Sequence, residues 1–250
     1  MLSSIKKIED LSLNAWPSHQ IQLYDGWLLR FSYFYTHRTN CVEQIGYSTI
    51  PLKEKIPYCE EIYRRWGTPC IFKISPIGSP DLDDYLAHKG YRIEHETTVM
   101  TRSLLDPSEF SGEIAVPGLK IENRVSESWL NALFTMKHIT DLRHLRVVPQ
   151  MYAAIPKDEI AVSVERDGRI IATGLGILDR DAVGVYAIHV DEAYRNQGIA
   201  RSVVSSILYE GQKAGSESAY LQVVSDNTPA KHLYRTLGFD TAFRYWFRVQ

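Results

Sequence analysis

The sequence has few cysteines, and they form no pattern that would bind a metal or build a disulfide framework. Cys41, Cys59 and Cys70 all lie in the first half of the 250-residue chain. Their number is odd, no two have CxxC spacing, and no His/Cys cluster accompanies them, which argues against disulfides and against a structural zinc site. We therefore expect three buried thiols and no metal.

The chain also lacks a long apolar run. No stretch approaches the roughly 18 apolar residues that a membrane span requires. The opening MLSSIKKIEDLSLNAW mixes lysines and acids where an export signal would be apolar. With 44% hydrophobic and 23% charged residues, the composition is typical of a globular protein. The prediction is a cytoplasmic protein with no membrane partner.

An excess of charge of one sign is missing as well. The 28 Lys and Arg residues and 30 Asp and Glu residues give a formal net charge of -2. Proteins that bind nucleic acid usually carry a basic excess, so no nucleic-acid partner is expected. The length fits one large domain or two ordinary ones.

One segment has the composition of a linker. Residues 104–118, LLDPSEFSGEIAVPG, gather proline, glycine, serine and acids without a helical or strand period. We place a linker at 106–118 between an N-terminal domain at 1–105 and a C-terminal domain at 119–250.

The C-terminal domain has the pattern of a mixed α/β fold. Ser126 is suited to cap the helix in SESWLNALFTMKHI, and Asp167-Gly168 predicts a hairpin turn between two strands. Later elements alternate between strand and helix patterns. They are the strand VGVYAIHV, a helix from Gly198, the strand AYLQVV, a helix opening at Thr228 and the strand FRYWFRV.

The N-terminal domain repeats part of this order. Its residues 52–102 read as helix, strand, short helix and strand, which is the order of residues 199–249. Gly90-Tyr91 stands where Gly238-Phe239 stands in the second copy. The pattern predicts a tandem of two copies of one fold.

The stretch AYRNQGIARS, residues 193–202, joins a strand directly to a helix. The first N–H groups of a helix are unpaired and carry partial positive charge, so such a loop is suited to bind an anion. Gly198 permits close approach of a ligand to the backbone. Arg195 and Arg201 flank the loop and are able to add charge-assisted bonds. We predict a phosphate or pyrophosphate site here.

VYAIHVDEAYRNQGIARSVV, followed by YLQVVSDNTPAKHLYRTLGF, resembles the GCN5-related N-acetyltransferases (GNAT) over residues 120–250. The resemblance implies a central, mostly antiparallel sheet flanked by helices, with a V-like opening at the coenzyme strand and acetyl-CoA as co-substrate. Asp191-Glu192 departs from the family, which often has a proline there. The implied coenzyme residues are Ile188 and Val190 for pantetheine, Arg195, Asn196, Gln197, Gly198, Ile199, Ala200 and Arg201 for pyrophosphate, and Asn227.

Residues 19–110, with DGWLLRF and THRTNCV, look like the front half of two-domain members of the same family. Leu86 stands where the second copy has Tyr234, and no Arg-x-x-Gly-x-Ala precedes the helix. We therefore expect that the first copy binds no coenzyme and serves as a structural lobe, which could wall the acceptor site.

The resemblance implies Tyr234 as general acid at the coenzyme sulfur and a backbone N–H near Ile188 that polarises the carbonyl. The strand VGVYAIHV offers no acid as general base, only His189 and Tyr186. Strand alternation places these two on opposite faces, so at most one faces the site. His189 is the candidate base; a water relay, or an amine that is already neutral, would serve equally.

The expected function is direct transfer of acetyl, in a ternary complex, to a primary amine of a small molecule or peptide, by a monomer or homodimer. A non-catalytic acyl-CoA sensor would not need Tyr234, and a Rossmann-type module would need a GxGxxG turn early in a parallel sheet. Acyl groups other than acetyl remain open.

The segment MKHITDLRHLRVVPQMY holds the candidates that would bind the acceptor. Its basic residues could hold a carboxylate or phosphate of the acceptor, and Asp141 could meet the acceptor's ammonium group. Alternatively, most of these charges form a solvated surface. The candidates are Lys137, His138, Asp141, Arg143, His144 and Arg146.

Overall fold

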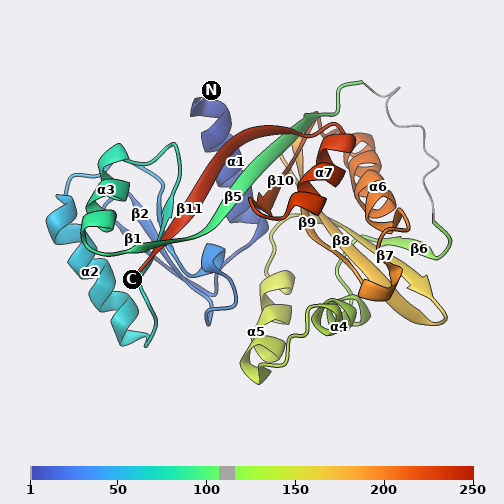
Figure 1. Cartoon of the computed structure of the whole chain (residues 1–250), viewed down its shortest axis with the longest axis horizontal. Helices are drawn as coiled ribbons and strands as arrows, with labels where there is room; N and C mark the ends of the chain where they lie inside the picture. The colour runs from blue at the N-terminus through green and yellow to red at the C-terminus, as the bar shows by residue number, and fades with distance from the viewer. Residues whose placement is uncertain (1, 107–115) are drawn as a thin grey trace.

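The centre of the protein is one mixed sheet of 11 strands in the order β1-β2-β3-β4-β11-β5-β10-β9-β8-β7-β6, with helices against it (Figure 1). The structure is a computed structural model that describes residues 2–106 and 116–250. Most of the predicted linker therefore lies outside the described residues. None of the described helices is long and apolar enough to span a bilayer.

The N-terminal half, residues 1–105, and the C-terminal half, residues 119–250, each contribute helices and strands. The first contains α1 (Leu2–Ala15), β1 (Gln20–Tyr24), β2 (Trp27–Phe31), η1 (His37–Thr39), β3 (Val42–Gln44), α2 (Leu52–Arg65), β4 (Ile71–Ile74), α3 (Pro80–His88) and β5 (Arg92–Ser103). The second contains β6 (Leu119–Glu122), α4 (Glu127–Met136), α5 (Leu142–Ala153), β7 (Asp158–Arg166), β8 (Arg169–Asp179), β9 (Ala182–Val190), η3 (Glu192–Tyr194), α6 (Ile199–Lys213), β10 (Ser218–Val224), α7 (Thr228–Thr236) and β11 (Asp240–Val249).

Local signals in the sequence set several of these boundaries as predicted. The Ser126 side chain accepts a hydrogen bond from the Trp129 N–H at the start of α4. Asp167 and Gly168 take φ angles of 50° and 73°, the turn conformation that closes the β7–β8 hairpin. The helices and strands expected after residue 180 are all present. The elements that were not predicted include α1, β6, the three strands β1, β2 and β3, and α5 as a separate helix.

The two halves exchange their last strands. β5 lies between β10 and β11, while β11 lies between β4 and β5. Read outward from its own parallel pair, the first half runs β3-β4-β11-β5 and the second runs β9-β10-β5-β11. Gly90 and Gly238 both have a positive φ, 87° and 77° respectively, and each precedes a buried aromatic residue. This correspondence supports the repeat that the sequence indicated.

The two faces of the sheet in the C-terminal half carry different layers. One face packs against α6 through a core that includes Val203, Ile207 and Leu221. The other packs against α4 and α5 through Trp129, Leu133 and Leu175 among others. We call these the α6 face and the α4/α5 face.

Candidate active site

The parallel strands β9 and β10 separate before either one ends. Their pairing runs from Ala182 opposite Ser218 to Val185 opposite Leu221 and stops there. β9 nevertheless continues to Val190 and β10 to Val224. The V-like opening expected at the coenzyme strand is therefore present.

A β-bulge at the opening changes which way the side chains of β9 point. Between the pairs Thr173–His189 and Leu175–Tyr186 the register advances by two residues on β8 and by three on β9. Ala187 lies at the bulge and has a φ of 49°. Because Thr173 and Leu175 share a face, Tyr186 and His189 share the α4/α5 face as well. The expectation that they lie on opposite faces is wrong.

The open edge of β9 presents backbone groups without a strand partner. The Asp191 N–H donates to the Ile171 oxygen of β8 at 2.8 Å. Since alternate residues direct their backbone groups to opposite edges, Val190 and Ile188 direct theirs to the side that β10 has left, where the Val190 oxygen accepts from Arg195 Nε at 3.3 Å. This is the arrangement that an extended ligand such as pantetheine would pair with, and the ligand role of both residues stays a prediction.

The loop before α6 also presents free donors. Asn196 and Gly198 have φ angles of 61° and 75°. α6 begins with no side-chain cap, so the N–H groups of its first turn keep no intrahelical partner. A Cβ added at Gly198 would meet no atom within 4 Å, so the space beside it is open. Ile199, by contrast, is buried in the core and anchors the loop.

The polar side chains of the loop have structural partners of their own. Arg195 pairs with Glu192 at 3.2 Å, and Arg201 Nη2 donates to Thr236 Oγ1 at 2.6 Å. Asn227 Oδ1 accepts from the Ala230 N–H at 3.1 Å and so caps α7. Gln197 Nε2 donates back to the Ala193 oxygen. The Arg201–Thr236 bond joins the start of α6 to α7, the Arg195 and Gln197 bonds lie within the loop, and Ala200 adds a small residue to the first turn.

Tyr234 has the properties of a proton donor. Its ring is 8% exposed and lies edge-on to Phe239, and burial raises the pKa of Tyr234 to about 12. Its hydroxyl donates to no residue in the described part of the chain. A phenol with a raised pKa is protonated at neutral pH, as a general acid must be.

His189 has the tautomer of a possible base. Its Nε2 lies 3.0 Å from the Met136 oxygen. A carbonyl only accepts, so Nε2 carries the proton and Nδ1 has a free lone pair. Burial lowers the pKa of His189, and the nearby Lys137 charge lowers it further. The ring is therefore neutral near pH 7.

The N-terminal half reaches this site, which the sequence left only as a possibility. His144 Nε2 bonds to the Tyr33 oxygen at 3.1 Å, and Lys137 Nζ lies 3.4 Å from Tyr35 Oη. From η1, Arg38 Nη1 donates to Gln222 Oε1 of β10 at 3.4 Å. The remaining candidates of the acceptor segment make no side-chain hydrogen bond or ion pair with the N-terminal half among the described residues. Asp141 and Arg143 pair with each other, and His138 and Arg146 are at the surface.

The equivalent loop of the N-terminal half, residues 45–51, is filled by an internal carboxylate. Asp25 accepts from the N–H groups of Thr49 and Ile50 at 3.0 and 2.8 Å. It also accepts from Ser48 Oγ and pairs with buried Lys55 at 3.0 Å. Asp25 thus takes the loop donors that an incoming phosphate would need.

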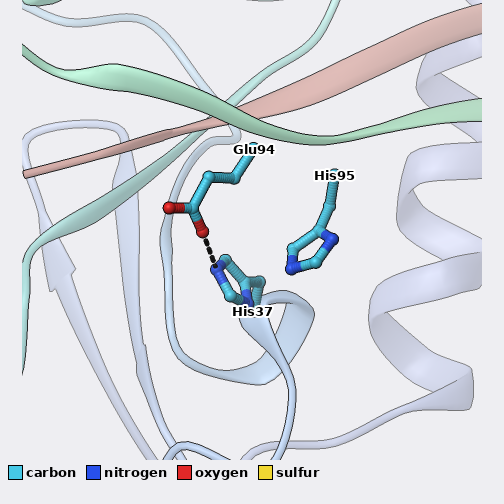
Figure 2. Close-up of side chains that lie close together, drawn as sticks. All are labelled: His37, Glu94 and His95. Atoms are coloured by element: carbon cyan, nitrogen blue, oxygen red, sulfur yellow. Dashed lines mark hydrogen bonds and ion pairs between the residues drawn. The ribbon is translucent and has the colours of Figure 1, made fainter.

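One group of side chains has the types that hold metal ions. His37, Glu94 and His95 offer ligand atoms within 4.8 Å of one another, as Figure 2 shows. His37 Nε2 lies 3.3 Å from Glu94 Oε2, and a bulge at His95, with φ of 49°, turns that ring toward His37. Sequence reasoning did not bring these three residues together, because His37 is far from the other two along the chain. The prediction of no metal stays a prediction, since the His37–Glu94 contact also explains the group as a polar cluster without an ion.

A diverging parallel pair, a bulged strand and an open loop leading into a helix define a GCN5-related N-acetyltransferase fold. The chain belongs to this family: residues 2–248 match the family model described as "Probable histone acetyltransferase Rv0428c C-terminal".

Several relatives are named as N-acetyltransferases. The chain is 25% identical over 252 residues to the uncharacterized N-acetyltransferase YobR of Bacillus subtilis, covering 100% of both proteins. It is 30% identical over 77 residues to the [ribosomal protein bS18]-alanine N-acetyltransferase of Escherichia coli, which is 31% of this chain and 52% of that protein.

Solved structures agree on the fold. A GCN5-related N-acetyltransferase from Kribbella flavida superposes with a TM-score of 0.70 at 14% identity, over 98% of this chain and 95% of that one. A tandem GNAT protein from the clavulanic acid biosynthesis pathway gives 0.64 at 12% identity, over 84% and 75%.

Proposed function

We propose that the protein is an acetyl-CoA-dependent N-acetyltransferase. It transfers acetyl directly to a primary amine of a small molecule or peptide within a ternary complex. The observation that carries the proposal is the open edge of β9 running into the uncapped start of α6, with the protonated hydroxyl of Tyr234 on the neighbouring helix.

Different backbone segments of the site would bind different parts of the coenzyme. The N–H groups from Gln197 to Arg201 would hold the pyrophosphate at the positive end of α6. The backbone of Ile188 and Val190 would pair with pantetheine. The N–H near Ile188 would then donate to the thioester oxygen and stabilise the charge that develops there. The coenzyme supplies the acetyl group and a thiol leaving group.

Two proton movements complete the transfer. The amine nitrogen bonds to the carbonyl carbon, and the carbon–sulfur bond breaks. Tyr234 gives its proton to the sulfur, and the amine loses a proton to His189 Nδ1 or to water. An amine that enters neutral and a water relay are both compatible with this site, and so are acyl groups other than acetyl.

A non-catalytic acyl-CoA sensor is the alternative. A sensor would keep the loop and Asn227 but would need no proton donor. The presence of a tyrosine at position 234 on α7 therefore favours the enzyme. We further propose a cytoplasmic monomer or homodimer that has no nucleic-acid or membrane partner.

The first experiment is isothermal titration calorimetry with acetyl-CoA, CoA and NAD, followed by thiol release from acetyl-CoA with a panel of amines. Binding of acetyl-CoA and CoA but not NAD, with amine-dependent release, supports the proposal. Binding without release from any amine supports the sensor. Absence of coenzyme binding overturns both.

A further inference from the structure

Two cations from different halves, Arg38 and Lys137, lie on the acceptor side, and their side-chain hydrogen bonds go to neutral groups. Lys137 Nζ lies 3.4 Å from Tyr35 Oη, in the same loop as Arg38, and Arg38 Nη1 donates to Gln222 Oε1. Crowding by the protein lowers the pKa of Lys137, and the Arg38 charge lowers it further. Within residues 2–106 and 116–250, neither cation forms an ion pair with an acid.

The buried charges of the Arg30 network, which holds the Arg38 backbone, are already balanced. Arg30 pairs with Glu43 at 3.1 Å, and Lys73 lies between Glu9 and Glu43. Two cations therefore face two carboxylates in that network. Arg38 is an additional positive charge, which a half-buried site tolerates best when an anion is close.

The backbone around Arg38 is held in place. Arg30 Nη1 donates to the Arg38 oxygen at 2.6 Å. Asn40 accepts from the N–H groups of Ser32 and Phe34 and donates to the Thr36 oxygen. Because its backbone is already braced, Arg38 would lose little conformational freedom when its guanidinium binds an anion.

This cationic pair lies on the face opposite the coenzyme phosphates. Leu221 and Val223 belong to the core on the α6 face. Gln222 alternates with them and so points to the α4/α5 face, where Arg38 meets it. The candidate phosphate loop begins α6 on the other side. His189 shares the α4/α5 face through its bond to Met136, so the cations are on the side where an amine would approach.

We propose that the acceptor carries an anionic group, a carboxylate or a phosphate, which binds between Arg38 and Lys137 while its amine reaches the opening of β9. A planar guanidinium binds two oxygens of either group at once, and a lysine adds a point charge. The N-terminal half then supplies acceptor specificity. This inference rests on the proposed function, since it concerns the acceptor of the same site.

The test compares matched amines that differ only in the anion. Amino acids are paired with their amides, and O-phosphoethanolamine with ethanolamine, and kcat/KM is measured by thiol release. We expect the anionic member of the best pair to exceed its neutral partner by about tenfold to a hundredfold, the range of a charged hydrogen bond. The preferred series tells carboxylate from phosphate. Arg38→Gln should abolish the difference and Arg38→Lys should keep part of it.

Arg64→Gln is the control, because Arg64 is an exposed arginine on α2 that already pairs with Glu61. It should leave the ratio unchanged. The melting temperature and the acetyl-CoA affinity of Arg38→Gln should match wild type. Equal use of both members of every pair, or equal slowing of both by Arg38→Gln, overturns the inference.

Loss of the proposed function would be seen separately. If acetyl-CoA binds but no amine is acetylated, the anion site is tested by binding alone: calorimetry in the presence of CoA measures the affinity for each member of the same amine pairs. Tighter binding of an anionic member that Arg38→Gln removes supports the anion site. No preference for any anionic member overturns it.

Discussion

Each half of the protein has a loop that leads into a helix, and the two loops differ in whether their N–H groups already bind a carboxylate. In the N-terminal half the Asp25 carboxylate accepts from two loop N–H groups and pairs with Lys55. In the C-terminal half the loop ends at Gly198 with open space beside it, and α6 has no side-chain cap. One loop contains its own anion, and the other is free to receive one.

Under the proposed function, this difference makes the first half a support for the second. The first half has the buried Leu86 at the position that corresponds to Tyr234, and Asp25 occupies its loop. It places its last strand β5 beside β10, and Arg38 of η1 contacts Gln222. We expect no coenzyme binding in this half.

The comparison would fail if the Gly198 loop did not bind the coenzyme. Gly198→Glu places a carboxylate at the predicted phosphate site, so we expect acetyl-CoA affinity to fall by more than about a hundredfold, since a like charge replaces a favourable helix end. Calorimetry measures the change. Gly46→Glu, in the loop of the first half, should leave the affinity unaltered.

Gly198→Ala separates charge from backbone strain. At a φ of 75° an alanine costs about 1 kcal/mol of backbone strain. The acetyl-CoA affinity of Gly198→Ala should therefore fall only modestly and stay measurable. Wild-type affinity in Gly198→Glu, or loss of affinity in Gly46→Glu, would contradict the assignment of the loops.

The second difference between the halves, Tyr234 against Leu86, predicts a catalytic effect. Tyr234→Phe removes the proton donor and keeps the ring against Phe239, so kcat should fall on the order of a hundredfold with little change in coenzyme affinity. Steady-state thiol release measures this. The more exposed Tyr209→Phe on α6 is the control and should behave as wild type. Full activity in Tyr234→Phe would assign the proton to water.

Removing the internal anion should affect stability alone. Asp25→Ala leaves two loop N–H groups without their acceptor and the buried Lys55 without its carboxylate, so we expect a melting temperature several degrees lower, read by circular dichroism. The acetyl-CoA stoichiometry should stay at one per chain. Asp10→Ala, which removes only the partner of Lys6 in an i,i+4 pair, should have a small effect.

The same carboxylate predicts a pH dependence. Hydrogen bonds from Ile50 and its neighbours lower the pKa of Asp25 below 3.8 in the folded state. Its contribution to stability is therefore full above about pH 3.8 and is lost as the pH falls through the folded-state value. Acid unfolding should be less steep in Asp25→Ala. A variant with unchanged stability and acid unfolding would show that the carboxylate is not needed in the loop.

Local signals in the sequence were enough for most of the C-terminal half. The turn at Asp167-Gly168, the cap at Ser126 and the glycine that opens α6 each act through neighbouring residues. The anion that fills the first loop was not visible, because Asp25 lies more than twenty residues from Thr49 and nothing in its surroundings marks it as a ligand. The same holds for Arg38, whose role depends on a strand from the other half.

The faces of β9 were predicted from strict alternation, which a bulge breaks. The extra residue at Ala187 has no distinctive sequence, since alanine neither favours a positive φ nor marks a turn. Sequence patterns report the average period of a strand, and a single shift in register inverts every face beyond it. Tyr186 and His189 were separated for this reason.

The bulge in β9 places His189 on the acceptor side. Replacing His189 should have a smaller effect than any of the test substitutions above. His189→Gln retains a donor for the Met136 oxygen and removes the titrating ring, so kcat/KM should fall by at most about tenfold, because water is able to take the amine proton instead. Burial lowers the pKa of His189 below 6.5, so protonation should reduce wild-type activity only at pH values under that limit. The variant should lack this acid limb, and the exposed His232→Gln on α7 should retain it. An unchanged acid limb in His189→Gln would assign the limb to the acceptor amine, and the C-terminal half would then contribute the proton donor without a matching base.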